Sequence, residues 1–325
     1  MARPQYAPKL YNQQATPDAK REAYAARISA FAEEGRKANL TSASEDPDGK
    51  RIAVILVDYQ FDFVYPHGTL AVRGAQDDVD RFLTWFYTNA NRITSIYASM
   101  DTHLPNQIFF STWWEDQHGN MPAPDKLPLR ITEEDVNSGR WRPRDPEQVA
   151  WSKYYVHQLK VRAKKELVIW PYHTMLGTMG HMLVPPISEA LAWHSTARQT
   201  RPTFIEKGRT ERTEYYSIFG AEVPDNKARE SYLNTALLEA IESHDQIYIA
   251  GEAQSHCVLE TAKTIVKRSE ANTRLMQRIY FLHDCSSPIQ GFETATRDDL
   301  AEMQKKGVKM VLSTGTIDQP KMVSV

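Results

Sequence analysis

The sequence predicts an α/β protein with three layers, in which a central, mostly parallel sheet is covered by helices on both faces. Three observations support this fold class. Short apolar runs alternate along the chain with longer amphipathic segments. The runs are continuously apolar, as at 52–57, and this is typical of strands buried on both faces of a parallel sheet. Polar side chains follow several of these runs directly, at the positions where such sheets bind ligands.

The expected strands are short apolar runs bounded by polar residues, glycine or proline. Val, Ile, Leu and aromatic residues dominate them, which favours extended backbone. A further apolar stretch at 166–170 leads to His173. Strands are expected at 51–58, 95–100, 203–207, 247–250, 278–285 and 308–312.

The expected helices have apolar residues three and four positions apart. Val79, Phe82 and Phe86 show this spacing, and so do Val258, Ala262 and Ile265. Each helix lies between two strands in the chain, as a parallel sheet requires. Helices are expected at 77–90, 153–165, 187–193, 231–242, 257–266 and 295–306.

Two segments lie outside this alternation. Residues 1–50 are expected to form an N-terminal helical extension, with one amphipathic helix at 18–40 on which Tyr24, Ile28 and Phe31 share a face. That helix would pack on the domain or on a second subunit. Residues 51–325 are expected to form one domain, interrupted by an insertion at about 111–165 that is rich in Trp, Pro and charged residues. The insertion would cover the site, form a subunit contact or elaborate the surface.

Composition excludes several classes of function. The 325-residue chain has a formal net charge of −2, which argues against broad binding of nucleic acid or of an anionic membrane. No apolar run approaches the length of a bilayer span, and the N-terminus has no apolar signal segment. The two cysteines, Cys257 and Cys285, make no disulfide framework. We therefore expect a cytoplasmic protein.

Three chemically active side chains lie just beyond the carboxyl ends of expected strands: Asp58, Lys207 and Cys257. Such strand ends meet at one edge of a parallel sheet, so side chains distant in sequence can form one site. Cys257 also begins a helix, where free N–H groups and a nearby ammonium would lower the pKa of its thiol. Each residue alone is compatible with a structural role, but the shared placement favours a cysteine nucleophile. Cys285 has no such neighbours and is interpreted as structural.

A second constellation indicates a metal site. Asp101 and His103 are two positions apart at a strand end, and His173 follows another apolar stretch. One carboxylate and two imidazoles would bind a divalent ion, for which zinc is preferred over manganese or iron. Asp-X-His alone is a weak signal, but three candidates at comparable positions favour the metal interpretation.

These residues belong to a set of short motifs that together resemble the isochorismatase-like cysteine hydrolases, and most closely the nicotinamidases. The motifs occur in the family's order over residues 51 to about 315. They are Asp58-Tyr-Gln-Phe-Asp-Phe63, Gly68-Thr-Leu-Ala-Val-Arg-Gly-Ala75, Asp101-Thr-His103-Leu-Pro-Asn106, Trp170-Pro-Tyr-His173, Gly177-Thr-Met-Gly180, Glu206-Lys-Gly208, Tyr216-Ser-Ile-Phe219 and Gly251-Glu-Ala-Gln-Ser-His-Cys-Val258.

The resemblance implies a role for each residue. Asp58 would be the general base, Lys207 its cationic partner and Cys257 the nucleophile that forms a thioester. The N–H groups of Ala253 and Cys257 would form the oxyanion hole after a cis peptide bond between residues 252 and 253. The resemblance also implies that Asp101, His103 and His173 bind one divalent metal that anchors a pyridine nitrogen, and that Phe63 and Trp170 form walls around the ring.

The implied activity is hydrolysis of a small amide, with nicotinamide as the expected substrate and a homo-oligomer as the expected assembly. Thr102, Thr174 and the segment Gln254-Ser255-His256 depart from the usual nicotinamidase residues, which bears on the substrate more than on the reaction. The sequence leaves two alternative functions open. One is a C–N hydrolase of the same fold acting on an N-carbamoyl, ureido or other small amide. The other is a non-catalytic binding protein.

Overall fold

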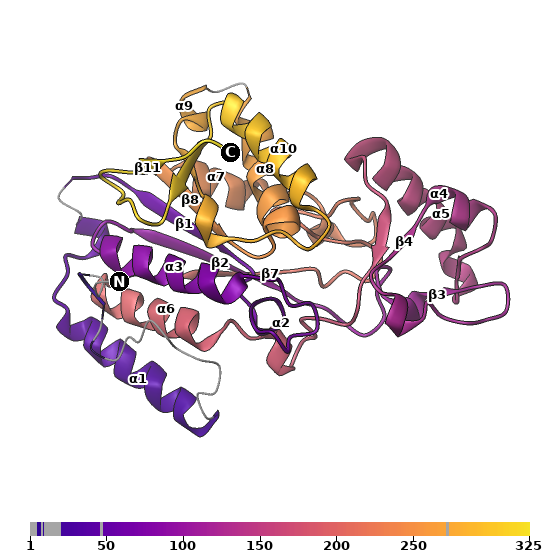
Figure 1. Ribbon diagram of the computed structural model, residues 1–325, viewed down its shortest axis with the longest axis horizontal. Helices are drawn as coiled ribbons and strands as arrows, with labels where there is room; N and C mark the ends of the chain where they lie inside the picture. The colour runs from indigo at the N-terminus through magenta and orange to yellow at the C-terminus, as the bar shows by residue number, and fades with distance from the viewer. Residues whose placement is uncertain (1–4, 8, 10–20, 46–47, 271–272) are drawn as a thin grey trace.

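The central sheet has seven strands in the order β11-β10-β9-β8-β1-β2-β7 (Figure 1). The computed structural model describes residues 5–7, 9, 21–45, 48–270 and 273–325. All neighbouring strands are parallel except β10 and β11. The predicted fold class is confirmed. The strands are β1 (Ile52–Val57), β2 (Ser95–Asp101), β7 (Thr203–Lys207), β8 (Gln246–Gly251), β9 (Ile279–Leu282), β10 (Lys309–Leu312) and β11 (Lys321–Met322).

Helices cover both faces of the sheet, as expected. Alternate residues of β1 enter two separate apolar clusters: Ile52, Val54 and Leu56 pack on one face, and Ala53, Ile55 and Val57 on the other. Such a strand has no solvent face, which explains its continuous apolar sequence. The first face holds α3 (Ala75–Asn89) and α6 (Pro185–Ala197), and the second holds α7 (Thr235–Glu242), α8 (Leu259–Ser269), α9 (Thr273–Met276) and α10 (Glu293–Lys305).

Several sequence-based boundaries differ from those observed. The strand expected at 278–285 ends at Leu282, and residues 283–285 form a 3₁₀ turn. The terminal strand β11 was not expected, because its two residues are too few to show a pattern. The apolar stretch near 166–170 contains β6 (Leu167–Ile169), which pairs with β4 (Leu129–Ile131) of the insertion and does not join the central sheet.

The N-terminal helix α1 (Arg21–Lys37) lies against α6 (Figure 1). Residues 18–20 of the expected helix and the side chain of Tyr24 lie outside the described part. Phe31 is 1% exposed within the apolar cluster of that face. Arg27 forms a 2.8 Å ion pair with Glu189 of α6. The extension therefore continues the helical layer on its own chain.

The insertion forms a small unit beyond the end of the sheet (Figure 1). Its apolar cluster includes Trp113, Trp114 and Tyr155. The helix expected at 153–165 begins earlier, at Val149, and ends in a π-helical turn at 159–163. That helix is α5 (Val149–Gln158), and the insertion also contains β3 (Trp114–Glu115), α4 (Glu133–Asn137) and β5 (Arg142–Pro143). Among the described residues, no helix is both long and apolar enough to cross a bilayer.

Candidate active site

Lys207 lies at the centre of the site and contacts three side chains. Its Nζ is 2.9 Å from Asp58 Oδ2, 2.9 Å from Asp101 Oδ1 and 3.4 Å from Cys257 Sγ. The ammonium also donates to the backbone oxygen of Tyr215 at 3.0 Å. The strands explain the convergence, because β8, β1, β2 and β7 are adjacent and parallel and end at one edge. The three residues expected at strand ends are thus brought together.

Burial governs the electrostatics of this cluster. Burial acts to lower the pKa of Lys207, but the carboxylates of Asp101 and Asp58 outweigh it and hold the pKa well above its usual value. Burial raises the pKa of Asp58 although the Lys207 ammonium opposes the shift. Ser99 Oγ donates to Asp58 Oδ1 at 2.6 Å and fixes the carboxylate. Lys207 is therefore a permanent buried cation between two acids.

Cys257 lies in a π-helical turn, Gln254–Val258, that leads directly into α8. The sequence indicated a lowered pKa for the Cys257 thiol, and this expectation is wrong. Burial raises the pKa of Cys257 well above its usual value, although Lys207 acts to lower it. The hydroxyl of Ser255 in this turn contacts His256 Nδ1 at 2.8 Å and accepts a hydrogen bond from the Ile289 N–H at 3.0 Å. The thiol is protonated at rest and needs a base.

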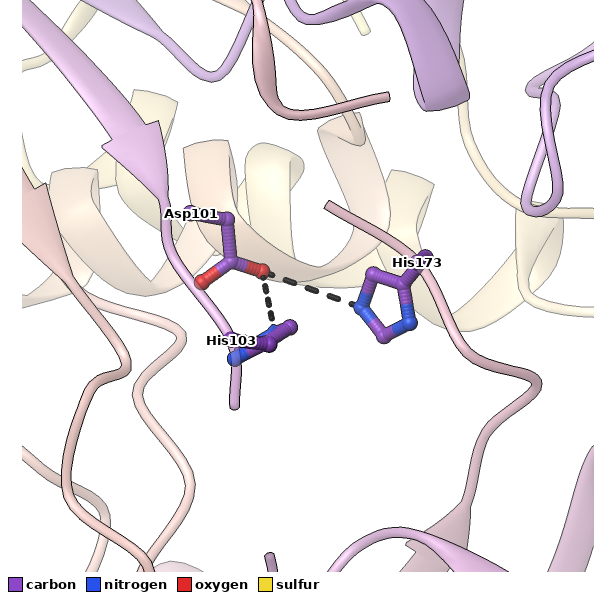
Figure 2. Close-up of side chains that lie close together, drawn as sticks. All are labelled: Asp101, His103 and His173. Carbon is purple, nitrogen blue, oxygen red and sulfur yellow. Dashed lines mark ion pairs between the residues drawn. The ribbon is translucent and has the colours of Figure 1, made fainter. Parts of the chain in front are cut away.

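Asp101, His103 and His173 form the second constellation (Figure 2). All three are buried, and their candidate ligand atoms lie within 4.8 Å of one another. Asp101 Oδ2 is 3.0 Å from His103 Nε2 and 3.8 Å from His173 Nε2. Figure 2 shows both imidazole rings turned toward the same carboxylate oxygen. The residues expected to bind a metal therefore lie side by side.

The hydrogen bonds of the two histidines fit a metal site. His103 Nδ1 lies 3.2 Å from the Gly208 oxygen, and His173 Nδ1 lies 2.8 Å from the Pro171 oxygen. A carbonyl only accepts, so each Nδ1 donates, and each Nε2 faces Asp101, where it can bind a metal ion once it carries no proton. Burial acts to lower the pKa of His103, but the Asp101 carboxylate outweighs it and raises that pKa. Burial lowers the pKa of His173 to about 4, which keeps that ring neutral. Two oriented imidazoles and a carboxylate suit a divalent ion.

Backbone contacts fix the Asp101 segment. The side-chain amide of Gln60 receives a hydrogen bond from the Asp101 N–H at 2.7 Å and donates to the Asp101 oxygen at 2.8 Å. Gly208 has a φ of +82°, and a Cβ there would lie 2.8 Å from both Asp101 Oδ1 and His103 Cε1. Only glycine fits this turn between Lys207 and the metal candidates.

A narrow cavity connects the two constellations. Phe63 and Trp170, the expected walls, both line it with Cys257 and His173. Ring centroids of Phe63 and His173 are 5.6 Å apart. Ala253 lines the same cavity, and the peptide bond between Glu252 and Ala253 is cis, as the resemblance implied. Within the described chain, the Ala253 N–H donates to no protein group, so it is available to an oxyanion.

Glu214 was missed by the sequence analysis. It is 4% exposed, lines the cavity, and burial raises its pKa to about 8. Its backbone N–H donates to the hydroxyl of Tyr155 at 3.0 Å. The residue belongs to a polar loop and follows no strand, so no strand-end pattern pointed to it. Glu214 is seven positions after Lys207 in the sequence, and only the folded loop brings it to the cavity beside Cys257.

Comparisons with known proteins agree with the predicted resemblance, although no family model matches the chain. The nicotinamidase of Saccharomyces cerevisiae is 22% identical over 225 residues, which make up 69% of this chain and 85% of that protein. The structure of that yeast enzyme bound to the inhibitor nicotinaldehyde superposes with a TM-score of 0.54 at 19% identity, covering 80% of this chain and 99% of that one. The chain has the nicotinamidase fold.

Two other solved structures show the same likeness. The Acinetobacter baumanii nicotinamidase and pyrazinamidase has a TM-score of 0.53 at 20% identity, covering 82% of this chain and 97% of its own. The L. infantum structure in complex with nicotinate has a TM-score of 0.50 at 19% identity, covering 85% and 96%. Because nearly all of each nicotinamidase is covered, the rest of this chain is additional to the shared fold.

Proposed function

We propose that the protein is a cysteine amidohydrolase that converts nicotinamide to nicotinate and ammonia through a thioester at Cys257. The observation that supports this best is the buried Lys207 ammonium, which contacts Asp58, Asp101 and Cys257 beside a histidine pair. A binding protein has no need for a thiol, a base and a cation in one buried cluster. The similarity to nicotinamidases supports the same reaction class.

The first step follows from the charges of the site. The raised pKa of Cys257 keeps its thiol protonated, and the Asp58 carboxylate is within 4.8 Å of the sulfur. Asp58 removes the proton as the sulfur attacks the amide carbonyl carbon. Lys207 stabilises the thiolate that forms. The N–H groups of Ala253 and Cys257 would bind the tetrahedral oxyanion.

The second half of the reaction returns the proton. Asp58 gives it to the departing nitrogen, which leaves as ammonia while the thioester forms. Asp58 then takes a proton from a water molecule as its oxygen attacks the thioester carbon. The bond to sulfur breaks, the acid is released, and Asp58 returns the proton to the Cys257 thiolate. Through both steps Lys207 stays charged, because the two carboxylates hold its pKa well above its usual value. The base is thereby kept in place in a site with little solvent.

Asp101, His103 and His173 would hold one divalent metal ion, with zinc preferred. When bound, the ion would anchor the pyridine nitrogen of the substrate. The chain itself supplies the walls: Phe63 and Trp170 are buried aromatic side chains lining the cavity on the way to Cys257. A flat aromatic amide fits between such walls better than a branched aliphatic one.

The test is ammonia release from nicotinamide by the purified protein, with bound metal measured in the same sample. Cys257→Ala should abolish release while leaving the circular dichroism spectrum unchanged. Acetamide and an N-carbamoyl amino acid serve as alternative amides. Release that persists in Cys257→Ala would refute the thioester mechanism. Cys257-dependent release from the alternative amides but not from nicotinamide would keep the mechanism and refute the substrate.

A further inference from the structure

Two buried acids lie behind the turn that holds Ala253 and Cys257. Glu252 directly precedes Ala253 and has no exposed surface. Asp78, in the first turn of α3, is 1% exposed. Burial raises the pKa of both carboxyl groups, and each also acts on the other: Glu252 acts to lower the pKa of Asp78, and Asp78 acts to raise that of Glu252. Neither belongs to the Lys207 cluster or to the metal candidates, so neither has a part in the proposed reaction.

Burial of the pair favours a shared proton. Asp78 Oδ2 and Glu252 Oε1 are buried and form no hydrogen bond among the described residues, although the Ser287 side chain acts to lower the pKa of Asp78. Two carboxylates cannot remain side by side away from water, whereas one carboxylic acid donating to one carboxylate satisfies both atoms. Arg81 pairs with Asp78. The guanidinium favours charge on Asp78, and this leaves the proton on Glu252.

Glu252 also connects the catalytic turn to its surroundings. The Ser287 N–H donates to Glu252 Oε2 at 3.3 Å. In return the Gln254 N–H donates to the Ser287 oxygen at 2.8 Å. Asp78 belongs to α3, on one face of the sheet, and Cys257 lies in the turn that leads into α8, on the other face. The pair thus joins the turn to both a neighbouring loop and a helix across the sheet.

We propose that Glu252, held in its acid form by Asp78, is a positioning residue that keeps the N–H groups of the Ala253–Cys257 turn aimed at the reacting carbonyl. This rests on the proposed function, because it assigns the turn to transition-state stabilisation. Glu252 itself touches no substrate. Removing its hydrogen bonds releases the turn, and this lowers kcat while KM changes little.

Because Glu252 holds a proton that it can lose, kcat should depend on pH. Burial and the neighbouring Asp78 raise the pKa of Glu252 well above its usual value. As pH rises through the raised pKa of Glu252, this residue loses its proton and places a second negative charge beside Asp78. We expect kcat to fall as a result. The other titratable and charged groups facing the pair are Arg81 of α3, Tyr59 after β1, and His283 and Cys285 after β9. Asp284 acts on Arg81, His283 and Cys285.

Four variants test the proposal: Glu252→Gln, Glu252→Ala, Asp78→Asn, and Asp77→Asn as a control at an exposed site on the same helix. Glutamine keeps a donor toward Asp78 and an acceptor for Ser287, so its kcat should stay within about threefold of the parent. Alanine should lower kcat by about 10²-fold, the scale of losing one oxyanion donor, with KM within about threefold. Asp78→Asn should fall between them.

The pH profile provides a second readout. The parent should lose kcat on the alkaline side, and Glu252→Gln should not, because it has no proton to lose. Equal losses in Glu252→Gln and Glu252→Ala, an unaltered alkaline limb in Glu252→Gln, or a smaller loss in Asp78→Asn than in Glu252→Gln would each overturn the proposal. A loss confined to KM would overturn it as well.

Alkylation of Cys257 by iodoacetamide, followed by peptide mass mapping, separates this inference from the proposed function. Cys257 is 6% exposed, so a released turn should make it react faster. Glu252→Ala should be alkylated at least fivefold faster than the parent and Glu252→Gln at the parent rate, whether or not nicotinamide is the substrate. Equal rates in all three proteins would refute the positioning role even if the parent releases no ammonia.

Discussion

One ammonium group balances the charge of the whole site. Lys207 lies between two buried acids and the thiol, and each of its contacts is 3.4 Å or shorter. A buried cation with this many partners is costly to remove, because the carboxylates are then left uncompensated in a low dielectric. The same side chain contacts Asp58, the proposed base, and Asp101 beside the two histidines. The proposed catalytic and metal-binding roles would therefore be coupled through Lys207.

His173→Ala should remove one of the three metal candidates. We expect bound divalent metal to fall at least tenfold, since second-sphere changes alone cost metal sites 10- to 100-fold in affinity. The KM for nicotinamide should rise with it. Metal content after dialysis is the measurement, and His118→Ala, an exposed site in the insertion, is the control. Metal that stays bound in His173→Ala would exclude this residue from the site.

On the acid side of the pH profile, activity should decline at a pH above the usual pKa of an aspartate. Burial raises the pKa of Asp58, with Lys207 opposing and Asp101 reinforcing the shift. A base works only when ionised, so kcat/KM should decline as pH falls through this raised pKa, above about 3.9. The profile of kcat/KM between pH 3.5 and 8 measures this, with metal content followed in parallel. A limb at or below 3.9 with metal retained would contradict the assignment of Asp58 as base.

Helix α1 shows how an element outside the catalytic fold can belong to the same core. Its apolar face packs on α6, and Phe31 is as buried as residues of the sheet. The ion pair between Arg27 and Glu189 lies at the same contact. None of these residues reaches the cavity beside Cys257. We infer that the extension contributes stability and that its loss would expose apolar surface on α6.

Phe31→Ala should destabilise the fold by about 3–5 kcal/mol, the usual cost of truncating a buried aromatic side chain. Chemical denaturation gives the free energy of unfolding. The kcat of the folded fraction should be unchanged, because the site is distant. Arg36→Ala, at an exposed position of the same helix, should change stability by less than about 1 kcal/mol. A loss of kcat without loss of stability would contradict a purely structural role.

The insertion connects to the catalytic unit through the loop that follows β7. Tyr155 of α5 accepts a hydrogen bond from the Glu214 N–H, and Trp151 donates to the Arg212 oxygen at 2.7 Å. The Arg212 guanidinium also lies 4.2 Å from the Trp151 ring centroid. Because Glu214 lines the cavity, the position of the insertion is linked to the shape of the site. We propose that this segment sets substrate preference.

Tyr155→Phe removes only the hydroxyl oxygen that accepts the hydrogen bond from the Glu214 N–H. The Glu214 N–H would lose its partner in a buried position, at a cost of about 1–3 kcal/mol in stability. We expect a rise in the KM for nicotinamide as the cavity wall loosens. Steady-state kinetics and thermal unfolding measure both effects, and Tyr154→Phe, at a neighbouring exposed site, is the matched control. Identical kinetics for the two variants would exclude a link between the insertion and the cavity.

The sequence by itself determined the fold class and the candidates for chemistry. The alternation of apolar strands and helices predicted a parallel sheet, and Asp58, Lys207 and Cys257 follow such strands, which predicted that they meet at one edge. The ordered motifs added the resemblance to nicotinamidases. The catalytic and metal-binding roles of these residues stay predictions, although the structure brings the side chains within contact distance.

Only the tertiary structure decided which groups share a proton or a charge. The contact of Lys207 with Asp101, the position of Glu214 on the cavity and the pairing of Asp78 with Glu252 join residues from separate segments. The raised pKa of Cys257 also depends on burial, which overrides the local effect of a helix start. Such properties arise from desolvation and from contacts across the sheet, and a local sequence pattern contains neither.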